Sequence, residues 1–184
     1  QIHANNLSDV LVLPAPAKIN VYLHITGKRD DGYHLLDTVF QLIDLQDTVK
    51  LRVRADGQLV LHTPIMHLPN EQHLAMRAAQ GLKIQTGCAL GADIWVEKNI
   101  PSGAGLGGGS SDAATTLMGL NALWHRGLST WELQAIGLKL GADVPFFLGG
   151  HNAFVEGIGE RLTPIRVAPA PLEVFTVTPS RNTL

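Results

Sequence analysis

A glycine-rich stretch, residues 98–112, carries the residue types that bind phosphate groups. Its sequence is KNIPSGAGLGGGSSD, with five glycines in the seven positions from Gly103 to Gly109. Glycine loses more backbone freedom on folding than any other residue, so a run this dense indicates left-handed backbone or an approach too close for a side chain. The segment 92–97 alternates like a strand, and the segment 112–124 has helical character. Free amides and the positive dipole end of a helix N-terminus bind anions, and phosphate is the expected one.

Other interpretations of this stretch fit less well. A Walker loop has Lys before Ser or Thr, but Gly109 precedes Ser110 here, which excludes it. The dinucleotide pattern GxGxxG occurs from Gly103 to Gly108, and one isolated match of that kind is weak. A flexible linker would not be flanked so closely by a strand and a helix, and Leu106 would be out of place in it. The sequence therefore favours a phosphate-binding loop.

The composition of the chain limits the class of protein. With 184 residues and 45% hydrophobic content, the chain can bury one core and suits a single domain. The formal net charge is −2 and Lys and Arg do not cluster, which argues against a nucleic-acid partner. One cysteine, Cys88, excludes an internal disulfide framework and fits a reducing cytosol. No apolar run reaches membrane-spanning length and no leader pattern opens the chain, so a cytoplasmic location with no membrane partner is expected.

The N-terminal third of the chain is predicted to be strands. Residues 1–9 are polar and expected to be frayed, and the apolar run 10–13 is expected to end where residues 14–17, PAPA, break regular pairing. Residues 18–25 then alternate as a strand. This alternation is expected to place Lys18, Asn20, Tyr22 and His24 on one face and Ile19, Val21, Leu23 and Ile25 on the other.

Two hairpins are predicted next. Residues 29–32, RDDG, form a turn signal, and residues 33–45 are expected to return as a long strand. Residues 48–54 and 58–62 are expected to form a second hairpin around the Asp-Gly turn at 56–57.

Helices dominate the remainder. Residues 70–73 open a helix that Gly87 ends, and Ser129 begins another with a capping box that is expected to run to about Leu140. Residues 141–147 are expected to break that helix. Strands followed by helices with interspersed strands indicate an α+β layered domain, a mixed β-sheet packed with helices. The apolar face of the first helix should comprise Leu74, Ala75, Ala78, Leu82 and Ile84, and short strands are expected at 153–156, 161–167 and 172–177.

Residues 101–111 resemble the ATP loop of the GHMP kinases, the family of galactokinase and of homoserine, mevalonate and phosphomevalonate kinases. Three further segments, 14–20, 32–34 and 140–146, are similar to motifs of one branch of this family and occur in the same order. Four collinear motifs are far more specific than any one. That branch phosphorylates a cytidine-diphosphate sugar alcohol in non-mevalonate isoprenoid precursor synthesis.

The resemblance implies transfer of the ATP γ-phosphoryl group to an alcohol of this small-molecule substrate. It makes Asp143 the base that accepts the hydroxyl proton and Lys18 the ammonium beside it and the phosphates. Mg²⁺ is expected with ATP, because a kinase must neutralise the β- and γ-oxygens, but its protein ligands cannot be assigned from the sequence. The ATP-binding residues implied are Pro101, Ser102, Gly103, Ala104, Gly105, Leu106, Gly107, Gly108, Gly109, Ser110 and Ser111.

On the substrate side, the resemblance places Tyr33 and His34 around cytosine and Asn20 near the substrate hydroxyls. Residue types alone leave other roles open: Tyr33 could be a core aromatic, Lys18 a surface strand residue and Asp143 a turn residue.

Two departures from the family pattern are visible. His73 stands where the family commonly has Asn near the adenine, and it could equally be a helix-start surface residue. Family members carry a second domain beyond the point that corresponds to Leu184, so residues 1–184 correspond to the N-terminal, ATP-binding domain, which alone could be inactive. A different GHMP kinase, of the homoserine or mevalonate type, or a nucleotide-binding protein without catalysis remain the alternatives. The oligomeric state is not predicted.

Overall fold

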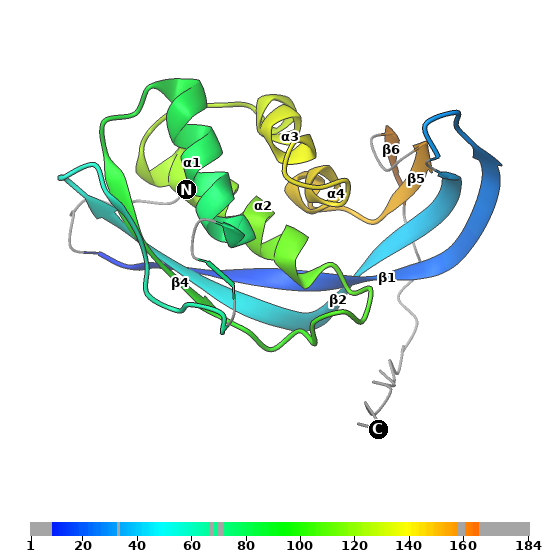
Figure 1. The fold of residues 1–184 in the computed structure, drawn as a ribbon, viewed down its shortest axis with the longest axis horizontal. Helices are drawn as coiled ribbons and strands as arrows, with labels where there is room; N and C mark the ends of the chain where they lie inside the picture. The colour runs from blue at the N-terminus through cyan, green and yellow to red at the C-terminus, as the bar shows by residue number, and fades with distance from the viewer. Residues whose placement is uncertain (1–8, 33, 67, 70–71, 158–160, 166–184) are drawn as a thin grey trace.

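The computed structural model describes residues 9–32, 34–66, 68–69, 72–157 and 161–165 of the chain. Within these ranges a single twisted sheet lies on one side of the molecule, and the helices cover one of its faces (Figure 1). Residues 1–8 of the predicted frayed start, the predicted last strand at 172–177 and Tyr33 lie outside the described residues. The elements in chain order are β1 (Leu11–Lys28), β2 (His34–Arg54), β3 (Leu59–Leu61), α1 (Leu74–Thr86), β4 (Gly91–Glu97), α2 (Gly108–Leu123), α3 (Thr130–Leu138), α4 (Val144–Gly149), β5 (Ala153–Gly157) and β6 (Arg161–Pro164).

The long strand β2 organises the sheet. It pairs antiparallel with β1 over almost its whole length, with β4 at one end and with β5 at the other. β3 runs parallel to β4, and β6 runs antiparallel to β5. The sheet is therefore mixed, and the α+β fold class predicted from the sequence is confirmed. The distal half of the β1–β2 hairpin projects past the helical layer, together with β5 and β6 (Figure 1).

Two of the strand predictions are wrong. Residues 14–17 do not interrupt the chain, because β1 continues through them and Pro14 pairs with Thr48 across the sheet. The irregularity that the prolines introduce is absorbed by a register shift between Pro16 and Lys18. The second hairpin does not form either, since β4 lies between β2 and β3 and takes the pairing that β3 was expected to make.

The predicted alternation of residues 18–25 holds only in part. Further register shifts fall between Asn20 and Tyr22 and between Ile25 and Gly27. Each shift changes which side chains share a face, because side chains alternate with a period of two. Lys18 is consequently buried, whereas Tyr22 and Ile25 are both exposed.

The starts of α1 and α3 agree with local sequence signals, whereas α4 is not predicted from the sequence. His73 caps α1, Gly87 ends it in the left-handed conformation, and the Ser129 capping box of α3 is present. Ile84, expected in the core, is 83% exposed and lies on the open side of α1. Residues 141–147 do not simply end a helix, because Pro145 occupies the first turn of α4, where its fixed φ suits a helix start.

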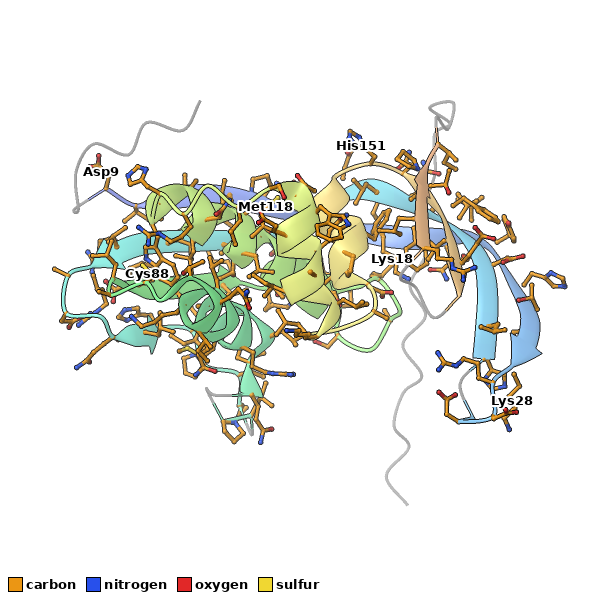
Figure 2. All side chains as sticks on the ribbon, turned by 90° about the horizontal axis from the view of Figure 1, so that it is seen from above. Asp9, Lys18, Lys28, Cys88, Met118 and His151 are labelled. Atoms are coloured by element: carbon orange, nitrogen blue, oxygen red, sulfur yellow. The ribbon has the colours of Figure 1, made fainter. Side chains whose placement is uncertain are left out.

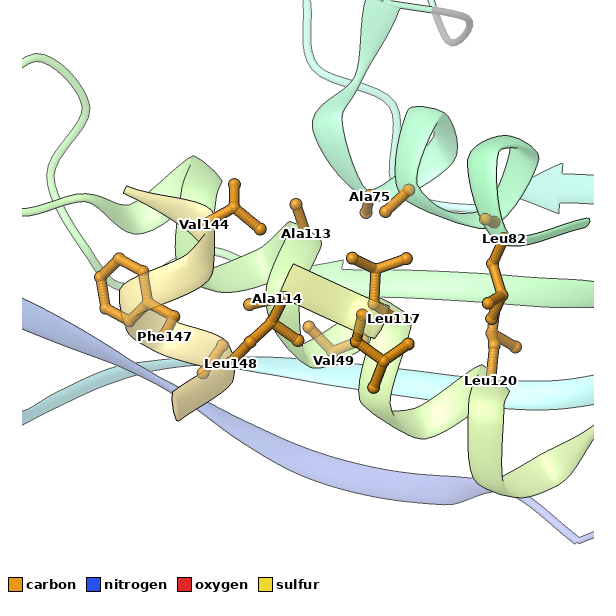
Figure 3. Packing of buried hydrophobic residues seen from close by; sticks show 14 of the residues in the cluster. Val49, Ala75, Leu82, Ala113, Ala114, Leu117, Leu120, Val144, Phe147 and Leu148 are labelled. Carbon is orange, nitrogen blue, oxygen red and sulfur yellow. The ribbon is translucent and has the colours of Figure 1, made fainter. Parts of the chain in front are cut away.

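The main core lies between α2 and the sheet, with α1 and α4 on either side (Figure 3). Leu117 and Leu120 of α2 are fully buried there, as is Val49 of β2. A Cβ at Gly119 would lie 2.4 Å from Leu51 Cδ1, so α2 packs against the sheet more closely than a larger residue would allow. This packing fixes α2, and with it the loop at its N-terminus. Within the described ranges, no helix combines the length and apolar character needed to cross a bilayer.

Candidate phosphate-binding and catalytic site

The glycine-rich stretch forms a loop between β4 and the start of α2, as predicted. Gly103, Gly105 and Gly107 have φ angles of 75°, 72° and 70°, so left-handed residues alternate along it. Such alternation turns successive amides toward one side and makes a concave nest for an anion. The first backbone bond of α2 runs from Ser111 N to Gly107 O at 2.9 Å, which leaves the amides before Ser111 outside the helical ladder.

Leu106 anchors this loop to the sheet. Its side chain is buried in a small apolar cluster with Ala17 and Ile100. Its carbonyl oxygen accepts a hydrogen bond from the backbone N–H of Lys18 at 3.0 Å. The apolar side chain of Leu106 therefore holds the glycine-rich loop against β1 beside Lys18.

Lys18 lies at the edge of the helical layer, where the hairpin begins to project (Figure 2). Its side chain is buried, its ammonium lies 4.2 Å from the centre of the Phe40 ring, and it donates a hydrogen bond to Asn20 Oδ1 at 2.5 Å. Burial lowers the pKa of Lys18, and the negative charge of Asp143 opposes this shift. The ammonium is thus held in place with a carboxylate as its electrostatic partner.

Asp143 stands at the N-terminus of α4 on the other side of the loop. Its carboxylate makes no capping bond to α4, so it is not committed to ending that helix. Two close approaches place α4 and the turn before it against the loop: a Cβ at Gly141 would lie 3.6 Å from Ser110 Oγ, and a Cβ at Gly107 would lie 2.9 Å from the Phe147 ring. A Cβ at Gly107 would also lie 3.3 Å from Lys18 Cγ. The loop, Lys18 and the start of α4 therefore meet at one point.

The predicted substrate residues extend away from this point along the hairpin. Asn20 contacts the Lys18 ammonium directly. His34 is exposed at the start of β2 and lies an even number of residues from Phe40, so the two share a face. Along the strand, six residue steps separate them, about 20 Å at roughly 3.3 Å per residue.

A cavity of about 390 Å³ adjoins the loop. The loop residues line one side of it, and Leu68, His73, Leu74 and Ile100 line another. His73 Nδ1 accepts a hydrogen bond from the amide of Ala75 at 3.2 Å, so this residue is the N-cap of α1 and not a surface residue. Burial, with a smaller effect of the Lys98 charge, lowers the pKa of His73. A second cavity, of about 530 Å³, lies between α3, α4 and the β5–β6 edge and contains none of the predicted site residues.

Three charged residues at the base of the loop were not assigned a role from the sequence: Asp47, Lys98 and Asp112. Lys98 Nζ donates to Asp47 Oδ2 at 2.5 Å and to Asp112 Oδ2 at 2.8 Å. Asp47 and Asp112 are essentially inaccessible to solvent. The sequence does not single out Asp47, because Asp44 lies in the same strand and only the structure shows which of the two acids is buried.

For a metal ion the described residues offer no dedicated protein site. Within the ranges that the structure covers, no group of three or more His, Cys, Asp or Glu side chains is arranged to hold one.

The family model described as the GHMP kinases N terminal domain matches residues 73–151, which include the glycine-rich loop and Asp143. Residues 73–151 thus match this family, and the resemblance that the four motifs predicted is confirmed. The match spans α1, β4, α2, α3 and α4, the elements that carry and flank the loop.

Two curated relatives carry the name of one branch of the family. A 4-diphosphocytidyl-2-C-methyl-D-erythritol kinase of Methylibium petroleiphilum is 61% identical over 164 residues, which cover 89% of this chain and 57% of the relative. The enzyme of the same name from Ralstonia nicotianae is 59% identical over 162 residues, or 88% and 56% of the two chains. The chain thus spans little more than half the length of these curated relatives.

Solved structures of related proteins have a similar fold. The crystal structure of a 4-(cytidine 5′-diphospho)-2C-methyl-D-erythritol kinase matches with a TM-score of 0.77 and 40% identity, over 89% of this chain and 61% of that one. A homoserine kinase from Cytophaga hutchinsonii matches with a TM-score of 0.66 at 17% identity, over 91% of this chain and 55% of that one, and shows the shared fold alone.

Proposed function

We propose that the protein carrying this chain is an ATP-dependent kinase that phosphorylates the 2-hydroxyl of 4-diphosphocytidyl-2-C-methyl-D-erythritol, a step of non-mevalonate isoprenoid precursor synthesis. One observation carries the proposal: the glycine-rich loop, Lys18 and the start of α4 at Asp143 meet at one point although they come from distant parts of the chain. The names of the relatives at 61% and 59% identity support the choice of substrate.

ATP occupies the cavity beside the loop in this proposal. Its phosphates lie in the nest of amides between Gly103 and Ser110, where main-chain N–H groups and the dipole of α2 favour negative charge. Its nucleoside extends toward Leu68, His73 and Ile100, the less polar side of the lining. The γ-phosphate then lies at the end of the nest closest to Lys18, next to Gly107.

The reaction needs a proton acceptor and positive charge at the same place. The substrate hydroxyl attacks the γ-phosphorus while its proton passes to the Asp143 carboxylate, and the bond to the bridging oxygen breaks to release ADP. A carboxylate is a weak base that is ionised at neutral pH, so the proton moves late, when the new bond is well formed. The Lys18 ammonium, whose electrostatic partner is Asp143, offsets charge on the transferring oxygens.

The substrate lies along the inner face of the projecting hairpin. Asn20, whose Oδ1 accepts a hydrogen bond from the Lys18 ammonium, would hydrogen-bond the hydroxyls beside the reacting group. His34 lies far along the same strand face as Phe40, which suits the base end of an elongated molecule. Tyr33, next to His34 in the chain, would supply a stacking surface for cytosine.

Mg²⁺ accompanies the ATP in this proposal. The described residues contain no cluster of ligating side chains, so the phosphate oxygens and water supply most of its ligands. When bound, the ion neutralises charge on the β- and γ-phosphates.

The remaining length of the relatives suggests the rest of the site. The chain covers 57% of the first relative, and we propose that a C-terminal domain completes the substrate wall. Residues 1–184 alone would then bind nucleotide weakly and turn over slowly. For this reason the full-length protein is the one to assay.

The test is an assay of the full-length protein with Mg-ATP and the cytidylyl sugar alcohol, in the wild type and the Asp143→Asn variant. The amide keeps the shape of the side chain but cannot accept the proton, so kcat should fall on the order of 10²–10⁴-fold with little change in the KM for ATP. Asp9→Asn is the matched control, because Asp9 is exposed at the opposite end of the described structure (Figure 2). Wild-type turnover by Asp143→Asn would remove Asp143 from the mechanism. Homoserine and mevalonate serve as competing alcohols, and preference for either would contradict the proposed substrate.

A further inference from the structure

The buried cluster of Asp47, Lys98 and Asp112 connects the two ends of the glycine-rich loop. Lys98 directly follows β4 and leads into the loop, whereas Asp112 lies in the second turn of α2 and leads out of it. Asp47 comes from the middle of β2, on the neighbouring strand. The proposed phosphoryl transfer uses none of the three, although Asp47 and Asp112 are 0% and 1% exposed.

Asp47 has the surroundings of an ionised carboxylate. Its Oδ1 accepts hydrogen bonds from the amides of Asn99 at 2.6 Å and Ile100 at 2.8 Å, and its Oδ2 accepts one from Lys98. Burial acts to raise the pKa of Asp47, but its hydrogen bonds to Asp112, Ile100, Lys98 and Asn99 outweigh burial and lower it. Asp47 therefore holds the first residues of the loop through two main-chain amides.

Asp112 has different surroundings. Its Oδ2 accepts from Lys98, but its buried Oδ1 finds no hydrogen-bond donor among the described residues. Its neighbour is the Asp47 carboxyl, within hydrogen-bonding reach. Two buried carboxylates facing one ammonium would leave a negative charge uncompensated, which is strongly unfavourable.

A proton on Asp112 removes both difficulties, because the protonated carboxyl donates to Asp47 and still accepts from Lys98. Burial, reinforced by the hydrogen bond to Asp47, raises the pKa of Asp112 to about 8 against the opposing effect of Lys98. Burial also acts to lower the pKa of Lys98, but its bonds to Asp112 and Asp47 prevail and raise it. The cluster thus contains one cation, one anion and one neutral acid.

We propose that Asp47, Lys98 and Asp112 are positioning residues that hold both ends of the phosphate loop, with Asp47 as the charged acceptor and Asp112 as a protonated donor. The inference rests on the proposed function only in that the loop binds the phosphates of ATP. By fixing where the chain enters and leaves the loop, the cluster keeps the amides of the nest aligned before the nucleotide arrives. Preorganisation of this kind strengthens binding because less order has to be imposed when the ligand binds.

The test makes the same substitution at the two carboxyls. In Asp112→Asn the amide NH₂ donates to Asp47 and the amide oxygen accepts from Lys98, as the protonated acid does, so the Kd for ATP should stay within about twofold of wild type. In Asp47→Asn an NH₂ group faces a donor, either Lys98 or the loop amides, so the Kd for ATP should rise about tenfold or more. At saturating ATP, kcat should change much less than Kd, which a general loss of folding would not produce.

A second measurement observes the protonated carboxyl directly. Carbon NMR of wild-type protein labelled at its Asp carboxyls should show one protonated carboxyl at pH 7, and this signal should be missing from Asp112→Asn. Equal effects of the two substitutions, the reverse order, or no protonated carboxyl would each overturn the inference. A wild-type protein that binds no ATP would instead overturn the proposed function, and the NMR signal would still test the arrangement of the cluster.

Discussion

Gly107→Ala probes the point where the loop, Lys18 and α4 meet. Gly107 has φ +70°, and a Cβ there would lie 2.9 Å from Phe147 Cε2 and Cζ and 3.3 Å from Lys18 Cγ. Left-handed backbone costs a non-glycine residue about 1–2 kcal/mol, and overpacking a filled site typically adds about 1–3 kcal/mol. We therefore expect Gly107→Ala to lower the free energy of unfolding by about 2–5 kcal/mol, measured by urea denaturation of the full-length protein.

Gly87→Ala separates the two contributions. Gly87 ends α1 with φ +62°, and no described atom lies within 4 Å of the position its Cβ would take. This variant should lose only the backbone contribution, about 1–2 kcal/mol, and its kinetics should match the wild type. The difference between the two variants measures the contact of Gly107 with Phe147 and Lys18.

The kinetic consequence follows from the same contact. To relieve it, either the Phe147 ring or the Lys18 stem has to move, and movement of the stem would displace the ammonium from the proposed position of the γ-phosphate. A misplacement of about 1 Å can reduce the rate about 10²-fold, so kcat of Gly107→Ala should fall about tenfold or more. If Gly107→Ala and Gly87→Ala lost equal stability and both retained wild-type kcat, the close approach of the loop to Lys18 and α4 would be refuted.

Two further predictions concern stability. Burial acts to raise the pKa of Asp93, but hydrogen bonds from His62, Arg52 and Arg54 bring it to about 2, below the usual 3.8. A lowered carboxyl pKa stabilises the fold above the unfolded value and loses this contribution as pH falls, so about 1–2 kcal/mol should disappear between roughly pH 4 and pH 2 in urea titrations. Asp93→Asn should flatten that region of the profile, and an unchanged profile would contradict the assignment. His73→Ala should lower the unfolding free energy by about 1–2 kcal/mol by removing the cap on Ala75 N, and His73→Ser, which can still cap, should lose clearly less.

Local sequence signals were sufficient to predict most of the helices. The helix α1 begins after His73 and ends at Gly87, as expected, and the Ser129 capping box starts α3. Such signals act within a few residues of chain. The helix α4 is not predicted for a related reason: Pro145 suggests a break, although Pro is also favoured in the first turn of a helix.

The sheet was less predictable because pairing depends on distant segments. The Asp-Gly turn at 56–57 suggests that β2 and β3 pair with each other, yet β4 lies between them. Nothing in residues 48–62 reveals that a strand some 35 residues later competes for the same edge. In the same way, Asp47 carries no signal of its partners in its own strand, because Lys98 and Asp112 are 51 and 65 residues away along the chain.

The positions of Lys18 and Asp143 in the sequence suggest a shared site only through the resemblance to the GHMP kinases. Neither residue lies in a local pattern that predicts catalysis, since one is a polar residue in a strand and the other precedes a helix. The glycine-rich loop differs, because its conformation requires glycine at several positions, and these glycines are visible in the sequence itself.

The irregularity of β1 explains how a strand residue reaches the loop. A regular strand with one open face alternates buried and exposed side chains, but Ala17 and Lys18 are consecutive and both buried. The register shift between Pro16 and Lys18 turns this segment of the strand, and the Lys18 amide then donates to Leu106 O in the loop. A bulge re-aims side chains in this way at many functional sites. The departure from alternation that made the strand hard to predict is therefore what brings Lys18 and the glycine-rich loop together.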